Sequence, residues 1–270
     1  MQAWCILIRL ALLMKADCSV QGTPATAACI CNPDFTKPVF RYIIRIHIDS
    51  EVVKVKELYL IRHGRQSSKL CNVDVSLDEA GRRQAELLAD RLTYDKIEKL
   101  YSSDLKRAVE TAGIIGKRLG LEPEVIPAFR EIDFGELTGK ADDVIVEEYK
   151  EFRRERSSQT SDLPYPGGEN GADVIRRVLP VWKEICQSAQ ERTAVVTHGG
   201  VIRSLCAYLL ETDLKNKLKF AVDLENTSIT EIRYDEKKEL FYLERFNDTA
   251  HLERHPELMR ESWKPSLIRR

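Results

Sequence analysis

Two short apolar runs predict strands that are buried on both faces. The first follows an alternation in which Val53 and Val55 are separated by a lysine, and it continues unbroken over residues 58–61. The second covers residues 194–196. Unbroken apolar runs of this length are typical of strands at the centre of a sheet that is covered by helices. We therefore expect both segments to be central strands.

Helical periodicity follows the first run. Asp78 is placed to cap a helix that continues to Leu92, because the apolar side chains in between recur on one face. A second helix is closed by Gly120. Its apolar face is expected to hold Leu105, Ala108, Val109 and Ala112, with Arg107 off that face.

The rest of the pattern completes an α/β fold. Helices are expected over residues 172–189 and from about Val201 onward. Further strands are expected near residues 100–101, over 125–131, and as a hairpin over 228–234 and 240–246. Strands that alternate with helices favour a three-layer α/β/α sandwich around a mostly parallel sheet.

The first 52 residues differ from the rest in their pattern of apolar and polar residues. The apolar run of residues 4–14 is interrupted by Arg9 and is shorter than the roughly 20 residues that span a bilayer. It is read as part of an extension (residues 1–52) that is poorly ordered or outside the mature domain, with a signal or anchor as the minor alternative. Residues 53–270 are predicted to form the domain, with the polar stretch of about 140–169 as a lid.

Composition narrows the classes of ligand. Lys and Arg number 42 against 43 Asp and Glu, for a net charge of -1, so nothing attracts the whole chain to nucleic acid or an anionic membrane. The seven cysteines form no CxxC pair and the five histidines are dispersed, which favours free thiols and a cytoplasmic location. No metal and no cofactor are expected. Oligomeric state has no signature in the sequence.

Candidate chemistry lies where the two buried strands end. Arg62 and His63 end the first strand and His198 follows the second, each histidine before a glycine. Ligands collect at the carboxyl ends of strands, and a helix that begins near Gly200 can direct backbone N–H groups at an anion. A guanidinium at Arg62 can hold two phosphoryl oxygens, although a surface ion pair is the ordinary alternative. The pattern indicates a local phosphate site.

Five motifs in one order resemble the histidine phosphatase superfamily, which includes the cofactor-dependent phosphoglycerate mutases. The resemblance extends from about Val53 to His251. The matching segments are residues 60–64 (LIRHG), 101–112 (YSSDLKRAVETA), 129–135 (FREIDFG), 166–169 (PGGE) and 196–200 (VTHGG), with 226–228 (NTS) and 247–249 (NDT) also similar. It implies a phosphoglycerate mutase-like fold.

The resemblance also implies a mechanism. His63 would be the nucleophile of a phosphomonoester hydrolase that forms a phosphohistidine, and Glu131 the general acid. Arg62, Arg107 and His198 would bind the phosphoryl oxygens, with the backbone at Gly199 also at the phosphate and Asn72 as a further amide donor, although Asn72 lies farther past His63 than the family's usual asparagine. Asp133 and Glu136 are the competing candidates for the acid.

Departures from the family pattern bear on the reaction. Mutases typically carry an arginine directly after the glutamate and a tyrosine soon after it, where this chain has Ile132 and Phe134. Hydrolysis is therefore preferred, and the mutase activity is kept as the alternative because Arg153, Arg154 or Arg156 could replace the missing clamp; the ordinary interpretation is solvated charges on a helix. A noncatalytic phosphoryl-binding protein is the second alternative. Sugar phosphates, phosphoglycerates and nucleotide-like monoesters all remain open as substrates.

Overall fold

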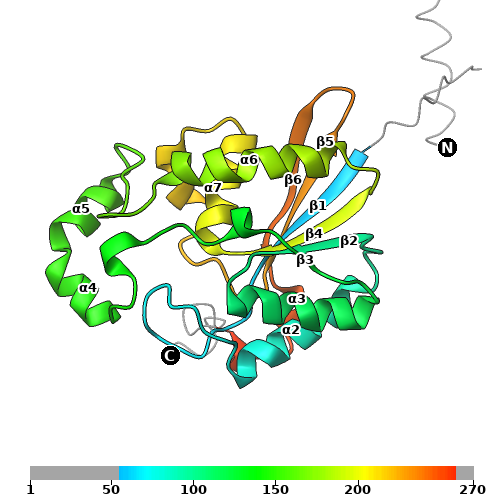
Figure 1. The fold of residues 1–270 in the computed structure, drawn as a ribbon, viewed down its shortest axis with the longest axis horizontal. Coiled ribbons are helices and arrows are strands. Elements are labelled where there is room, and N and C mark those ends of the chain that lie inside the picture. The colour runs from blue at the N-terminus through cyan, green and yellow to red at the C-terminus, as the bar shows by residue number, and fades with distance from the viewer. Residues whose placement is uncertain (1–54, 260–270) are drawn as a thin grey trace, which may run out of the picture. The chain divides into compact units, whose positions relative to one another are not determined.

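The computed structural model describes residues 55–259, so the predicted extension of residues 1–52 lies outside them. Within this part of the chain, six strands form one sheet in the order β3-β2-β4-β1-β5-β6 (Figure 1). The first four strands pair in parallel, whereas β5 is antiparallel to both β1 and β6. The strands are β1 (Val55–Arg62), β2 (Lys99–Ser102), β3 (Glu124–Val125), β4 (Arg192–Thr197), β5 (Ile229–Asp235) and β6 (Leu240–Asp248).

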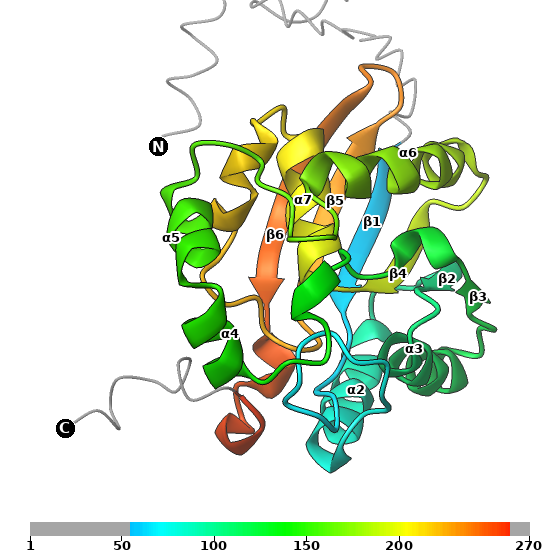
Figure 2. The same ribbon diagram turned by 60° about the vertical axis from the view of Figure 1, so that its left-hand side comes forward.

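Helices cover both faces of this sheet (Figure 1, Figure 2). On one side lie α2 (Glu79–Leu92) and α3 (Lys106–Leu119), and on the other α6 (Gly171–Gln187) and α7 (Gly199–Leu209). The predicted lid segment holds α4 (Asp142–Glu148) and α5 (Lys150–Ser158). The short 3-10 turns are η1 (Pro127–Phe129), η2 (Gly135–Leu137), η3 (Leu214–Lys219), η4 (Ala250–Leu252) and η5 (Pro256–Leu258). The predicted three-layer, mostly parallel architecture is confirmed.

The unbroken apolar run of β1 feeds two hydrophobic cores. Side chains alternate between the faces of a strand, so Leu58 and Leu60 join the core beneath α6 and α7. Tyr59 and Ile61 join the other core, beneath α2 and α3. Both faces are therefore covered, which is why the run carries no polar position.

The predicted helix boundaries hold at α2 and at the end of α3. The carboxylate of Asp78 accepts a hydrogen bond from Gly81 N at 2.7 Å, and Gly120 ends α3 in the left-handed region (φ 71°). Placing Val109 on the buried face was wrong, because that side chain is 39% exposed. Placing Arg107 off the buried face was also wrong, because the residues that form this face are Arg107, Ala108, Thr111, Ala112, Ile115 and Gly116.

The strand predicted over residues 125–131 was wrong beyond Val125. Pro127 has no N–H to donate to a neighbouring strand, and it begins the turn η1 instead. Phe129 then enters the core, and Thr197 Oγ1 donates to the Phe129 carbonyl at 2.7 Å. The chain thereby leaves the sheet and carries Glu131 to the ends of the central strands.

The carboxyl end of β1 is held by the buried loop that precedes β5. The Thr227 N–H donates to the Arg62 carbonyl at 3.0 Å, and Asn226 Nδ2 donates to the His63 carbonyl at 2.9 Å. Nε2 of His251 lies 3.0 Å from the Thr227 hydroxyl. Burial, with Arg91 nearby, lowers the pKa of His251 to about 3, so this ring is neutral in the fold.

The buried neutral state of His251 predicts a pH dependence of stability. An unfolded histidine takes up a proton below about pH 6.5, whereas His251 in the fold does not until about pH 3, so the free energy of unfolding falls as the pH drops between these values. The loss from this residue is about 2 kcal/mol between pH 7 and pH 5. Denaturant unfolding at pH 7 and pH 5 should show that the free energy of unfolding falls less in His251→Gln than in the wild type. The difference between the two falls should be about this amount. Equal slopes for His251→Gln and the wild type would contradict the prediction.

Candidate functional site

The two predicted histidines emerge from neighbouring strand ends. β1 and β4 are paired so that Arg62 lies opposite Thr197. The next residue of each strand is a histidine, and the ring centroids of His63 and His198 are 5.0 Å apart. Both rings are buried, His198 completely. Parallel pairing of the two apolar runs therefore places the imidazoles side by side at one edge of the sheet.

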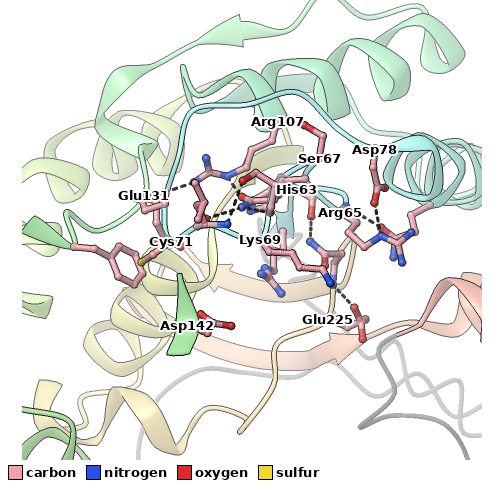
Figure 3. Close-up of a pocket in the computed structure, with 18 of the residues that line it drawn as sticks. His63, Arg65, Ser67, Lys69, Cys71, Asp78, Arg107, Glu131, Asp142 and Glu225 are labelled. Carbon is pink, nitrogen blue, oxygen red and sulfur yellow. Dashed lines mark hydrogen bonds and ion pairs between the residues drawn. The ribbon is translucent and has the colours of Figure 1, made fainter. Parts of the chain in front are cut away.

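The tautomer of His63 is fixed by the next residue's backbone. Nδ1 lies 2.7 Å from the Gly64 carbonyl oxygen, which can only accept, so Nδ1 carries the proton. Nε2 is then left with its lone pair, and the Arg107 Nε–H donates toward it at 3.2 Å. His63 lines a cavity of about 750 Å³ (Figure 3). A nitrogen held unprotonated at a cavity wall is arranged as a nucleophile.

Arg107 is a buried guanidinium with neutral partners. It lies in the first turn of α3 and is only 2% exposed. Its Nη1 donates to the Val73 carbonyl and its Nη2 to Asn72 Oδ1, both at 2.9 Å. Burial lowers its pKa, although Glu131 and Asp74 act against this shift. A buried cation whose hydrogen-bond partners are all neutral suits an anionic ligand.

Asn72 contacts Arg107 from the cavity wall. Its backbone adopts a left-handed conformation (φ 47°), and its Nδ2 reaches the Ile132 carbonyl at 3.4 Å. Because Oδ1 accepts from Arg107, the amide orients that guanidinium in addition to lining the cavity. The prediction of a phosphate-binding amide therefore stays a prediction, and orientation of Arg107 is what the geometry adds.

Ser103 orients the ring of His198 and was not singled out from the sequence. Its hydroxyl accepts from the Leu105 N–H at 3.2 Å and lies 2.8 Å from Nε2 of His198. A neutral ring that accepts the hydroxyl proton at Nε2 carries its own proton on Nδ1, an atom with no partner among the described residues. Burial, with His63 and Arg107 nearby, holds the pKa of His198 well below its ordinary value, so the ring is a neutral donor.

The carboxylate of Glu131 lies against the first turn of α7. Its Oε1 accepts from the N–H groups of Ile132 and Gly200, each at 2.9 Å. A Cβ at Gly200 would lie 2.5 Å from this oxygen, so only glycine admits the carboxylate here. The helix N–H group predicted to face phosphate at Gly200 is therefore bonded to Glu131. A carboxylate at a helix N-terminus is held firmly in place.

Arg177 on α6 and Glu169 just before this helix support the loop that carries Glu131, and neither was assigned a role from the sequence. Arg177 forms two hydrogen bonds to Glu169, both at 2.9 Å, and donates to the carbonyls of Ala128 and Glu131. Glu169 also accepts from the Asp133 N–H at 3.0 Å. The only available signal was Glu169 in the PGGE motif, because a helical arginine gives no indication of its distant partners.

Arg62 lies between two cavities at the end of β1. Its Nη1 donates to the Leu224 carbonyl, which fixes the guanidinium against the loop that precedes β5. It lines the large cavity and also a second one of about 260 Å³, and the two cavities share Arg62, Glu131 and Phe134. The remaining walls of the large cavity are residues 65–72, Asp78, Gln84, Arg107, Asp142, Glu225, Asn226 and Leu258, with His63.

The predicted site residues converge in the fold. Arg62, His63, Asn72, Arg107 and Glu131 all line the large cavity, whereas His198 is buried against His63 and Gly199 lines the smaller cavity. The competing acids lie elsewhere, since neither Asp133 nor Glu136 lines the large cavity. Within residues 55–259, no group of three or more His, Cys, Asp or Glu side chains is arranged to hold a metal ion.

Comparison with known proteins identifies the family. Residues 58–249 match the histidine phosphatase superfamily (branch 1). The chain is 37% identical over 219 residues to phosphoglycerate mutase-like protein 4 of Arabidopsis thaliana, covering 76% of this chain and 90% of that protein. A mycobacterial glucosyl-3-phosphoglycerate phosphatase is 27% identical with a TM-score of 0.65, covering 72% of this chain and 99% of the other.

A second solved structure is a phosphoserine phosphatase mutant from Entamoeba histolytica in complex with phosphoserine. It is 26% identical to this chain with a TM-score of 0.62, covering 73% of this chain and 99% of the other. The family resemblance and the enzyme class that it implied are confirmed. The chain is an enzyme of the histidine phosphatase superfamily, branch 1.

Proposed function

We propose that this protein hydrolyses phosphomonoesters of small metabolites through a phosphohistidine on Nε2 of His63. The observation that carries the proposal is the contact between Nδ1 of His63 and the Gly64 carbonyl, which leaves Nε2 unprotonated beside Arg107. An imidazole nitrogen in that state can attack phosphorus without first losing a proton. The ester oxygen leaves, and the phosphoryl group is transferred to the ring.

The groups around His63 suit a phosphoryl group that carries two negative charges. Arg107 and Arg62 supply guanidinium donors at the cavity wall, and His198 supplies a neutral Nδ1–H. Preorganised donors of this kind stabilise the equatorial oxygens of a phosphoryl group in flight. Since the chain as a whole is nearly neutral, this local concentration of donors accounts for selective anion binding.

Glu131 suits both proton transfers of the cycle. In the first step its carboxyl group gives a proton to the departing ester oxygen, and in the second the carboxylate takes a proton from the water that attacks the phosphohistidine. That water releases inorganic phosphate and restores the neutral His63. The two backbone donors on Oε1 fix the carboxyl group, so Oε2 is the oxygen available for the proton.

The alternatives differ in what accepts the phosphoryl group. Mutase activity requires a second phosphorylated ligand to be retained, and Ile132 and Phe134 stand where the family's mutases typically carry carboxylate-binding residues. This favours water as the acceptor. Formation of 2-phosphoglycerate from 3-phosphoglycerate faster than phosphate release would favour the mutase alternative. A noncatalytic binding protein would not need an unprotonated Nε2.

Two separate observations bear on membrane-spanning helices and on the cellular compartment. Among residues 55–259 the structure contains no helix of the length and apolarity that a bilayer crossing requires. We propose a cytoplasmic location because the described cysteines Cys71, Cys186 and Cys206 are free thiols.

His63→Ala should abolish the formation of the phosphoenzyme. With p-nitrophenyl phosphate, the wild type should release nitrophenol steadily, whereas the variant should lose activity by at least about a thousandfold because the nitrogen that receives the phosphoryl group is removed. Rapid mixing with a ³²P-labelled ester, followed by an alkaline quench, should trap acid-labile label on the wild type alone. His255→Ala, a partly exposed histidine outside the cavity, is the control. Equal rates for His63→Ala and the wild type would exclude the mechanism.

Glu131→Gln should separate the two chemical steps. An amide retains an oxygen for the two backbone donors but transfers no proton, so turnover of an alkyl phosphate should fall about 10²- to 10⁴-fold. Nitrophenolate leaves without protonation, so p-nitrophenyl phosphate should still phosphorylate His63 and the phosphoenzyme should accumulate. Stopped-flow mixing should then show a burst of nitrophenol.

Glu136→Gln is the matched control for this experiment. Glu136 is exposed and its carboxylate contacts the Tyr149 hydroxyl at 3.4 Å, outside the large cavity. This variant should turn over both esters at the wild-type rate. A loss in Glu136→Gln with none in Glu131→Gln would reverse the assignment of the general acid.

A further inference from the structure

The smaller cavity extends the site on the far side of the proposed acid. It holds about 260 Å³ and shares Arg62, Glu131 and Phe134 with the cavity that contains His63. An ester oxygen that receives a proton from Glu131 must lie beside this shared wall. The remainder of the leaving group can therefore extend into the smaller cavity, whose lining selects it.

The lining of the smaller cavity is rich in cationic side chains. It includes four cationic residues against two acidic ones, and one of the acids is Glu131, which is bonded to the first turn of α7. Low-dielectric walls lined mostly by one sign of charge concentrate ligands of the opposite sign. The cationic residues are Arg62, Arg156, Arg203 and Lys217.

Arg156 is the side chain in this cavity that most needs a ligand. It lies on α5, with its guanidinium 4.2 Å from the centre of the Tyr165 ring. Its Nη1 is buried, and none of the described residues accepts a hydrogen bond from it. Arg153 and Arg154 on the same helix are exposed, as expected for solvated charges, whereas Arg156 is not. A buried donor without an acceptor is destabilising, more so when it is charged, and a bound carboxylate would supply the acceptor.

Lys217 contributes a second buried charge to the same cavity. Its side chain is 5% exposed, and it forms an ion pair with Asp162. That carboxylate also accepts from the N–H groups of Gly171 and Ala172, so three donors share it. Burial lowers the pKa of Lys217, as expected for a cation that its partner only partly stabilises.

We propose that the smaller cavity binds a carboxylate of the leaving group, with Arg156 as its main partner, so that the preferred substrates are small phosphorylated carboxylic acids. The assignment rests on the proposed hydrolysis at His63. It adds that the alcohol released past Glu131 carries a negative charge. Ile132, Tyr165 and Leu224 form the apolar and aromatic parts of the wall and cannot offset that charge, so Arg156 and Lys217 bind it. A neutral hydroxyl in the same place could accept a hydrogen bond from Nη1 of Arg156 but would bring no charge to offset that of the guanidinium.

Two esters that differ at one position test this directly. 3-Phosphoglycerate and glycerol 3-phosphate share a backbone and differ in a carboxylate against a hydroxymethyl group. The wild type should have a kcat/KM at least tenfold higher for the carboxylate, mainly through KM. Arg156→Gln should reduce the ratio of the two values about tenfold or more, and Arg156→Lys, which keeps the charge without the planar fork, should reduce it less.

Arg154→Gln is the matched control, since it removes an exposed charge from the same helix and should leave the ratio unchanged. p-Nitrophenyl phosphate separates the two levels of the proposal. If the wild type hydrolyses it and yet uses both glycerol esters equally well, the carboxylate subsite is wrong and the proposed hydrolysis stands. If the wild type hydrolyses none of the three, the proposed hydrolysis itself is wrong. A wild-type ratio that persists in both Arg156 variants would assign the selectivity to other residues and overturn the role of Arg156.

Discussion

The hydrogen bond from Nδ1 of His63 to the Gly64 carbonyl is the interaction on which the proposed chemistry depends. A backbone carbonyl has no proton to give, so this contact determines which ring nitrogen is protonated. It works only if the carboxyl end of β1 is held still. That end is held by Asn226 and Thr227, which donate hydrogen bonds to the carbonyls of residues 62 and 63. His251 contacts Thr227 in turn. The tautomer at the cavity wall therefore depends on the buried loop that precedes β5.

A second constraint follows from where the charges lie. The first turn of α7 would be an ordinary place for phosphate, but its Gly200 N–H is bonded to Glu131. The helix end therefore positions the acid, and guanidiniums take the role of binding the phosphoryl oxygens. Arg107 suits that role because its hydrogen-bond partners are neutral, so an arriving dianion meets a cation that forms no hydrogen bond to a protein carboxylate. Because the helix end positions the acid and the guanidiniums bind the phosphoryl oxygens, a carboxyl group and two guanidiniums lie within one small site.

Local pattern predicted most of the sheet, and distant contacts account for what it missed. The apolar runs of β1 and β4, the Asp78 cap and the Gly120 helix end are encoded within a few residues, and each was correct. Val109 was misplaced because helical periodicity defines an apolar stripe without fixing its rotation toward the core. Ser103 and Arg177 were not found, since their partners lie 95 and 46 to 49 residues away along the chain. Such pairings exist only once the fold has formed.

The site thus has two parts of different origin, and this bears on how its selectivity can change. The phosphoryl-binding part is built on the ends of central strands, and two hydrophobic cores set the positions of these strands. Arg156 lies on α5, a helix with no buried residues, and reaches the smaller cavity by stacking on Tyr165. A change at Arg156 alters few core contacts and leaves His63 and its supports in place. Selection of the leaving group can therefore vary independently of the phosphoryl chemistry.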